Sequence, residues 1–250
     1  VHSVGINFRD VLNVLGAYPG DPGPPGADCS GVVYSRCNLS NSSNDILVGD
    51  AVIALASGSF ATTVDVPFSV VSLLCDGVSF ELAASTPSVY MTVWLALQQA
   101  CGASANDTIL VHAGSGGIGT AAINVSNVLG ANVWSTAGNV AKRGYVRALG
   151  VHSVCSTRST AFSEPFHSGV DLILNSLTSS GMIASSLSCI RTGGRFVELG
   201  KRDIWSTKSM KMERPDLTYN LVALDFLPPS HVQKIMTDLS HALALGAVKP

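Results

Sequence analysis

Three glycines, separated by one and then two residues, form the clearest chemical signal in the chain. Gly114, Gly116 and Gly119 follow an apolar run at 108–112 and open an apolar stretch at 118–129. A strand, a glycine turn and a helix in this order bring free backbone N–H groups and the positive end of a helix dipole to one place, which suits a pyrophosphate. We therefore predict a dinucleotide site. Its predicted contacts are Gly114, Gly116, Gly117, Ile118 and Gly119.

The segment after the next apolar run indicates which dinucleotide binds. NAD sites place an acidic residue about 20 positions after the glycines, where its carboxylate binds the ribose hydroxyls. Residues 135–143 contain no Asp or Glu and end in Lys142 and Arg143, and Arg158 follows the next apolar run. Because cations bind a 2′-phosphate, we predict NADPH, with Lys142 and Arg158 as phosphate contacts. The alternative is that these side chains are ordinary solvated charges.

The elements that must position this site alternate between strand and helix. Apolar runs predict strands at 108–112, 132–136, 153–155, 170–174 and 195–199. Apolar residues at helical spacing predict helices at 90–97, 118–129 and 140–149. This alternation is typical of an α/β fold with a doubly wound parallel sheet, the Rossmann arrangement.

Residues 1–80 follow a different pattern, in which short apolar runs are separated by Gly and Pro. Runs at 31–34, 51–55 and 68–71 predict a small β-rich, barrel-like unit, and the polar stretch at 38–45 predicts an exposed insertion.

Three parts are expected along the chain. They are a substrate lobe at 1–84, a dinucleotide-binding domain at 85–222 and a return toward the first lobe at 223–250. Ligands are expected in the cleft between the two lobes. Both ends of the sequence are expected to be cut from a longer polypeptide.

The composition is that of a globular chain with few charges. Apolar residues make up 46% of the 250 residues, charged residues 13%, and the formal net charge is −2. Nucleic-acid binding needs a basic surface, so no such partner is predicted. No apolar run reaches the roughly 18 residues of a membrane helix, and no signal peptide is expected. The six scattered cysteines form no CxxC pair, which favours a reducing, cytoplasmic compartment.

Five ordered motifs resemble the enoylreductase domains of type I polyketide synthases and of animal fatty-acid synthase. They are GINFRDVL at 5–12, LGAYPG at 15–20, HAGSGGIG at 112–119, GVDLILNSL at 169–177 and GRFVELGKRD at 194–203. The resemblance covers nearly the whole chain. It implies the zinc-free, quinone-oxidoreductase-like branch of the medium-chain dehydrogenase/reductase superfamily, in which a GroES-like substrate lobe accompanies the Rossmann domain.

The resemblance also bears on metal binding. Zinc-dependent members of this superfamily hold the ion with a Cys in the segment matching 5–10 and a His in the segment matching 26–28. Here Asn7, Phe8 and Ala27 stand in these segments, so no metal is expected. Asn7 and Asp10 either shape the floor of the cleft or cap the backbone. His112 is expected to cap or pack rather than to transfer protons.

The reaction implied by the resemblance is NADPH-dependent reduction of the α,β double bond of an enoyl thioester. The substrate would be carried by an acyl carrier protein, and other synthase domains would be neighbours. Lys201 and Asp225 resemble the family's proton donors, and Tyr18 resembles the tyrosine that sets the side of protonation. Thr92 and Asn175 are implied as cofactor contacts. The alternatives are a surface amine for Lys201, a helix cap for Asp225, a packed loop aromatic for Tyr18 and a core residue for Thr92.

Two other functions remain open at this point. One is a free-standing NADPH-dependent quinone or enone oxidoreductase of the same fold, which would differ only in its substrate. The other is a catalytically silent module that binds NADPH and serves a structural purpose in a synthase.

Overall fold

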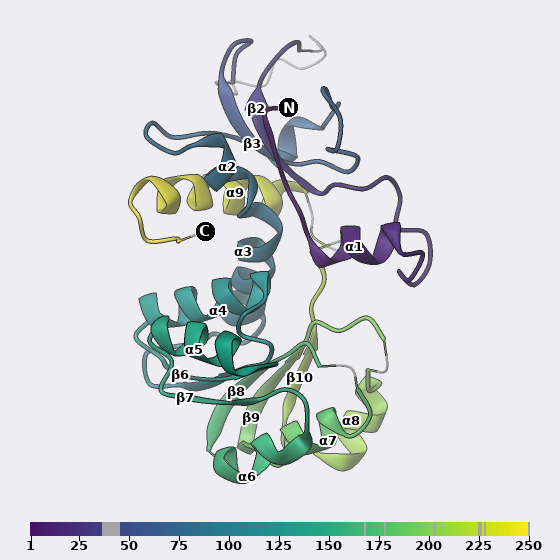
Figure 1. Cartoon of the computed structure of the whole chain (residues 1–250), viewed down its shortest axis with the longest axis vertical. Coiled ribbons are helices and arrows are strands. Elements are labelled where there is room, and N and C mark those ends of the chain that lie inside the picture. Colours follow the sequence, from purple (N-terminus) through teal and green to yellow (C-terminus); the bar gives the residue numbers. More distant parts are fainter. Residues whose placement is uncertain are drawn as a thin grey trace. The chain divides into compact units, whose positions relative to one another are not determined.

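The chain forms two compact units, and each has its own sheet (Figure 1). Unit 1 combines Val1–Met91 with Leu224–Pro250, and unit 2 is Thr92–Ala223. The computed structural model describes residues 1–36, 46–167, 169–177, 179–202, 204–224, 227 and 229–249. The insertion predicted at 38–45 and the candidate Asp225 lie outside these residues.

Unit 2 is built on six parallel strands in the order β10-β9-β8-β5-β6-β7. Their bounds are β5 Thr108–Val111, β6 Asn132–Ala137, β7 Ser153–Ser156, β8 Val170–Asn175, β9 Ile190–Glu198 and β10 Thr218–Leu221. The chain runs outward from β5 to β7, returns beside β5 with β8 and then runs outward to β10. This is a doubly wound sheet whose order reverses between β5 and β8, so the predicted Rossmann class is confirmed.

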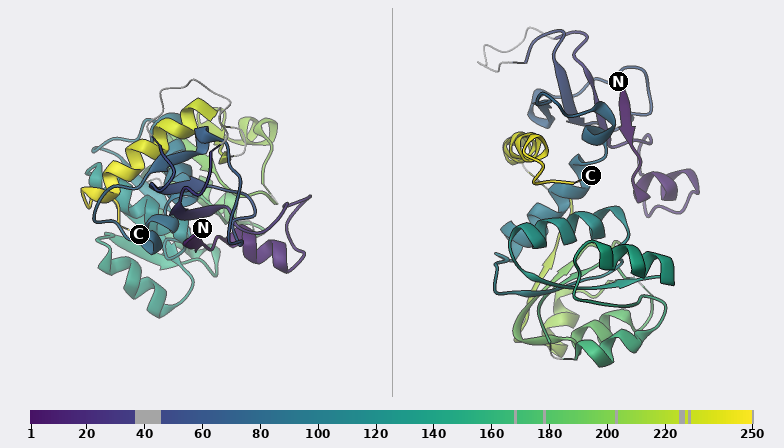
Figure 2. Two further views of the ribbon diagram at one scale, coloured as in Figure 1. Left: turned by 90° about the horizontal axis from the view of Figure 1, so that it is seen from above. Right: turned by 60° about the vertical axis from the view of Figure 1, so that its left-hand side comes forward.

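Helices cover both faces of this sheet. Figures 1 and 2 show α4 and α5 on one face and α6, α7 and α8 on the other. Their bounds are α4 Gly117–Val128, α5 Val140–Ala148, α6 Ser163–Phe166, α7 Met182–Leu187 and α8 Thr207–Glu213. With both faces covered, β5 is buried at all four positions, as the unbroken apolar run predicts.

The helix predicted at 90–97 is present as α3 (Pro87–Trp94), which continues as a π-helix over Leu95–Ala100. The sequence does not predict β10. The side chains of this strand are all half-buried or exposed, so the segment lacks the apolar run that marks the other strands.

Unit 1 contains an antiparallel sheet in the order β1-β2-β3-β4, and helices accompany it. The elements are β1 Ser3–Gly5, α1 Phe8–Val14, β2 Asp28–Val32, β3 Ala51–Leu55, β4 Val71–Leu73, α2 Phe80–Ala84 and α9 Pro229–Ala244. Ser240 on α9 donates a hydrogen bond to the carbonyl of Leu73 at 2.6 Å. The last segment of the chain therefore packs in the same unit as the first 91 residues.

Two of the predicted strands in unit 1 are displaced. The run at 31–34 contributes only its first half to β2, which starts earlier, at the buried polar residue Asp28. The run at 68–71 begins as a 3-10 turn, because Val70 N–H donates to the carbonyl of Pro67 at 3.1 Å, and becomes β4 only at Val71. Among the described residues, no helix is long and apolar enough to cross a membrane.

Candidate functional site

The turn between β5 and α4 requires two of its three motif glycines for internal packing. Gly114 and Gly119 are buried. A Cβ on Gly119 would lie 2.5 Å from the carbonyl oxygen of Ala113 and 2.6 Å from the Cα of Gly114, and a Cβ on Gly114 would overlap the hydroxyl of Ser135. These glycines therefore let the turn lie against both α4 and β6.

The middle glycine faces open space. Gly116 is exposed, and a Cβ there would have only the Ala113 carbonyl near it, at 3.4 Å. The first bond of α4 runs from Thr120 N–H to the Gly116 carbonyl at 2.8 Å, and no described side chain caps the helix. The N–H groups of Gly117 and Ile118 thus belong to the unpaired first turn, which is the arrangement that binds an anionic phosphate.

A strained residue starts this turn. Ala113 has φ of 52°, in the left-handed region that a residue with a Cβ rarely adopts. Thr136 on β6 holds it there, because its hydroxyl accepts from Ala113 N–H at 3.3 Å and its carbonyl accepts from Gly114 N–H at 2.8 Å. The turn is therefore fixed by the neighbouring strand before any ligand binds.

The imidazole of His112 supports the same turn from inside unit 2. Its Nδ1 lies 3.0 Å from Thr136 Oγ1 and its Nε2 lies 2.9 Å from Ser186 Oγ. Since the Ser186 hydroxyl donates to the Met182 carbonyl at 2.8 Å, it accepts from Nε2–H, and Nδ1 accepts from Thr136. Burial lowers the pKa of His112 to about 3. The ring is neutral and structural, in agreement with the packing role expected for it.

Cations surround the turn that follows β6. Asn139 caps α5 by accepting from Lys142 N–H at 2.8 Å, so Lys142 and Arg143 stand in the first helical turn, where the helix dipole disfavours cations. The Arg158 guanidinium lies beside Gly138, since a Cβ on this glycine would be 3.4 Å from Arg158 Nε. Lys142 and Arg158 thus both border the turn at the carboxyl end of β6.

The neighbouring ends of β8 and β9 carry a buried amide and a buried carboxylate. Asn175 pairs in register with Glu198, and its Nδ2 donates to Glu198 Oε2 at 2.7 Å. Burial raises the pKa of Glu198. Lys201 follows three residues later and is exposed. Glu198 was not among the predicted site residues, although a carboxylate that ends an apolar strand is a visible signal.

In unit 1, α1 holds the loop that carries Tyr18. The Arg9 guanidinium carbon lies 5.1 Å from the centroid of the half-buried Tyr18 ring, and Arg9 also donates to the Pro22 carbonyl at 2.9 Å. One turn along the helix, Asn13 donates to the Gly23 carbonyl at 2.9 Å. The polar side of α1 therefore anchors both Tyr18 and the loop that follows it.

Two buried carboxylates lie at the start of α1. Asp10 accepts from the N–H groups of Asn7 and Gly26 at 2.8 and 2.7 Å, which is backbone capping, one of the two roles expected for it. Asn7 donates its side-chain amide to Asp28 at 2.8 Å, and the Ser88 hydroxyl donates to Asp28 at 2.6 Å. Burial raises the pKa of Asp28 to about 6. Sequence reasoning missed Asp28.

The remaining predicted positions are less informative. Thr92 is half-buried on α3. Within the ranges that the structure describes, no three or more His, Cys, Asp or Glu side chains are grouped so that they could hold a metal ion.

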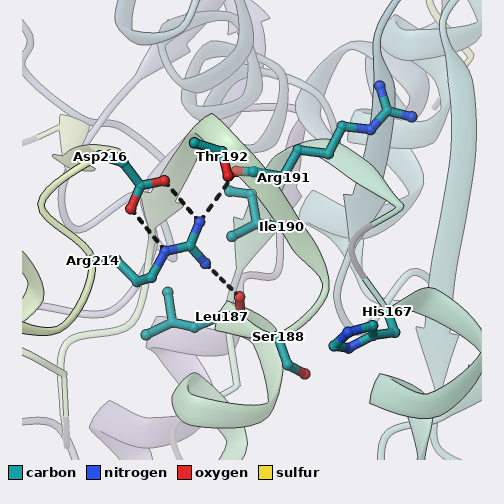
Figure 3. A pocket seen from close by; sticks show the side chains of 8 residues that line it. All are labelled: His167, Leu187, Ser188, Ile190, Arg191, Thr192, Arg214 and Asp216. Carbon is teal, nitrogen blue, oxygen red and sulfur yellow. Dashed lines mark hydrogen bonds and ion pairs between the residues drawn. The ribbon is translucent and has the colours of Figure 1, made fainter.

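A separate pocket of about 690 Å³ lies in unit 2, near the amino ends of the strands β8 to β10 (Figure 3). Its lining residues are His167, Leu187, Ser188, Ile190, Arg191, Thr192, Arg214 and Asp216. The arginines are already engaged, since Arg214 binds Asp216 and the Leu187 carbonyl, and Arg191 binds Asp171. The pocket is at the amino ends of β8 to β10, whereas doubly wound sheets bind ligands at the carboxyl ends. It is not the dinucleotide site.

Comparison with known proteins places this geometry in context. The chain matches the family model described as zinc-binding dehydrogenase over residues 117–224. This match does not include 5–10 or 26–28, the two segments in which the zinc ligands of related enzymes are expected.

Polyketide synthases are among the similar proteins. Highly reducing polyketide synthase poxF of Penicillium oxalicum is 34% identical over a match that covers 98% of this chain and 10% of that protein. The chain thus spans about a tenth of the length of this curated relative.

Two solved structures are also similar. The nucleotide-binding subdomain of the enoylreductase domain of PpsC from Mycobacterium tuberculosis is 30% identical, with a TM-score of 0.58, and the match covers 64% of this chain and 95% of that one. The CurK enoyl reductase is 29% identical, with a TM-score of 0.88, and the match covers 98% of this chain and 79% of that one.

Proposed function

This chain belongs to the enoylreductase domains of polyketide synthases, within the medium-chain dehydrogenase/reductase superfamily, and from that membership we propose that it uses NADPH to reduce the α,β double bond of a carrier-bound enoyl thioester. The products would be the saturated thioester and NADP⁺. The proposed partners are an acyl carrier protein and neighbouring synthase domains, because the match to poxF covers only 10% of that much longer protein.

The turn after β5 fits a dinucleotide. Gly114 and Gly119 close the turn, while Gly116 leaves its outer face open. The N–H groups of Gly117 and Ile118, at the uncapped start of α4, would hold the pyrophosphate. The strained Ala113 is already held by Thr136, so the turn would need little rearrangement when it binds the ligand.

The charges around the end of β6 favour NADPH over NADH. An NAD site would need a carboxylate there to bind the ribose hydroxyls, and residues 135–143 contain none. Instead Lys142 and Arg143 add positive charge to the already positive start of α5, and Arg158 lies beside Gly138. A doubly charged phosphate would be stabilised by all of these groups, which otherwise repel one another.

The chain's own residues have two tasks in the proposed reaction, both of which follow hydride transfer. When bound, the reduced nicotinamide supplies the hydride that adds to the β-carbon of the enoyl thioester. The protein must then stabilise the developing enolate oxygen and deliver a proton to the α-carbon. Lys201 is our candidate proton donor, because it is an exposed amine in the loop after β9, at the ligand-binding edge of the sheet. Asp225 would be its partner, and Tyr18 would set the face that is protonated.

The observation that carries this proposal is the open glycine turn together with the cations at the end of β6. The direct test measures NADPH oxidation by the chain with a crotonyl thioester, and compares NADH and a soluble quinone under the same conditions. We expect thioester reduction with a clear preference for NADPH. Faster reduction of the quinone would favour the free-standing oxidoreductase. Tight NADPH binding with no turnover of either substrate would indicate a structural module.

A further inference from the structure

A carboxylate that the proposed reaction does not use lies buried at the ligand-binding edge of unit 2. Glu198 ends β9 and is only 1% exposed. No cation forms an ion pair with it among the described residues. Burying an ionised carboxylate is unfavourable unless hydrogen bonds satisfy it, and an apolar side chain of similar size would usually be at least as stable there. Such a group calls for an explanation other than stability.

The hydrogen bonds of Glu198 connect two strands and the loops that follow them. One carboxylate oxygen accepts from Asn175 Nδ2 at 2.7 Å and the other accepts from Gly200 N–H at 2.6 Å. The side-chain oxygen of Asn175 in turn accepts from Leu177 N–H at 3.2 Å, and its backbone carbonyl accepts from Leu199 N–H at 2.9 Å. The loop after β8 and the loop after β9 are therefore attached to the same pair of side chains.

The loop after β9 is the one that carries Lys201. Gly200, whose N–H is held by the buried carboxylate, is the residue immediately before it. We propose that Glu198, oriented by Asn175, is a positioning residue that fixes the backbone from which Lys201 extends toward the substrate. This inference rests on the proposed function, since it assumes that Lys201 acts on the thioester.

The first test is a double-mutant cycle. Glu198→Gln keeps the size of the side chain but removes its charge and presents an amide donor to the Asn175 amide. We expect it to lower kcat by about tenfold or more, with the Kd for NADPH nearly unchanged, because a misplaced catalytic group impairs the chemical step. In a Lys201→Ala background the same change should have little further effect, since no amine is left to position. An equal loss in both backgrounds would overturn the positioning role.

The second test does not depend on activity. Trypsin cleaves after Lys201 and Arg202, so its rate at this segment reports how firmly the loop is held. Glu198→Gln should accelerate this cleavage at temperatures well below the Tm of both proteins, although the mismatched buried amides will also lower its Tm. The matched control Glu213→Gln, an exposed residue on α8, should not. Unchanged cleavage in Glu198→Gln would overturn the inference even if the wild-type chain reduces thioesters. If Glu198→Gln is cleaved faster but the wild-type chain does not reduce thioesters, the result would instead count against the proposed function alone.

A swapped pair completes the design. The double variant Asn175→Asp with Glu198→Gln restores one carboxylate and one amide to the two strand ends, with their places exchanged. We expect the loop to regain part of its resistance to trypsin, because the bond between the two strand ends returns while the bond from Asn175 Nδ2 to the Leu177 carbonyl is lost. If neither protection nor turnover recovers, the effect of Glu198→Gln is not due to the pair, and the proposed role of Asn175 is wrong.

Discussion

Arg158 lies beside Gly138, so that a Cβ on this glycine would be 3.4 Å from Nε and 3.5 Å from Nη2 of the guanidinium. Gly138→Asp would therefore place a carboxylate against the arginine and in the position that an NAD site requires. The backbone can accept the change, because Gly138 is not among the residues with positive φ. We expect the KM for NADPH to rise by about 10- to 100-fold, since a charge-assisted hydrogen bond contributes about 1.5–3 kcal/mol. The KM for NADH should stay the same or fall.

The control for this substitution is Gly144→Asp, which adds the same charge to α5 at a position with no neighbouring atom within 4 Å. It should leave both KM values close to those of the wild type. An unchanged preference for NADPH in Gly138→Asp would remove Arg158 from the proposed phosphate site.

Two glycines of the turn should affect different properties. Substitution of Gly119 should lower both stability and NADPH affinity, whereas substitution of Gly116 should lower NADPH affinity alone. In Gly119→Ala the new Cβ meets three backbone atoms that cannot move without opening the turn, so we expect a loss of about 1–3 kcal/mol in unfolding free energy together with weaker NADPH binding. In Gly116→Ala the new Cβ has free space and the φ of −86° suits alanine. The Tm should stay near that of the wild type, while the Kd for NADPH should rise about tenfold or more, because the methyl group would lie where the pyrophosphate approaches.

Thermal unfolding and fluorescence titration of NADPH, run on both variants, give the two quantities. Normal NADPH affinity in a stable Gly116→Ala protein would mean that the dinucleotide does not rest on this turn. The proposed function would then lose its main support.

The parts of the fold that could be predicted are those in which local sequence and burial agree. The strands β5 and β8 read as apolar runs because helices cover both faces of their sheet. The glycine motif could also be predicted, because the backbone atoms that leave no room for a side chain at Gly119 belong to the same short turn. By contrast, β10 has no buried side chain, and the turn at Pro67 displaced the expected strand at 68–71.

The parts of the site that escaped prediction depend on partners far away in the sequence. Glu198 matters because Asn175, 23 residues earlier, stands next to it on the neighbouring strand. The buried Asp28 carboxyl is satisfied by Ser88, 60 residues later, which donates a hydrogen bond to it. Neither pairing can be read from local spacing. The position of Glu198 at the end of an apolar strand marks it as unusual, but only the fold shows which group it binds.

Asp28 should make stability depend on pH in an unusual direction. Burial raises its pKa from 3.8 to about 6, so the folded chain binds this proton more tightly than the unfolded chain. The contribution of Asp28 to stability is therefore fully present below about pH 4 and is lost as the pH rises through 6, with a total on the order of 3 kcal/mol. Carboxylates with lowered pKa values, such as Asp107 and Asp216, act in the opposite direction.

Because of these opposing groups, the test compares variants rather than absolute stabilities. Urea unfolding of the wild type and of Asp28→Asn is measured from pH 4 to pH 7. The difference in unfolding free energy between them should shift in favour of the variant as the pH rises. Asp65→Asn, an exposed change in the same unit, should show no such trend. A difference that is constant across this range would show that Asp28 does not titrate there.

Lys201 and Asp225 should affect turnover without affecting cofactor binding. Lys201→Ala removes the proposed proton donor, and loss of a general acid typically lowers the rate by about 100-fold or more, so kcat for the crotonyl thioester should fall by that order. The Kd for NADPH should remain near the wild-type value, because the proposed phosphate contacts lie at the turns after β5 and β6. Lys208→Ala, an exposed lysine on α8, is the matched control and should leave kcat unchanged.

If Lys201 and Asp225 act as one relay, adding Asp225→Asn to Lys201→Ala should cause little further loss of kcat. Full activity in the double variant would exclude both residues from the proton transfer, and the donor would then have to be a different group or water.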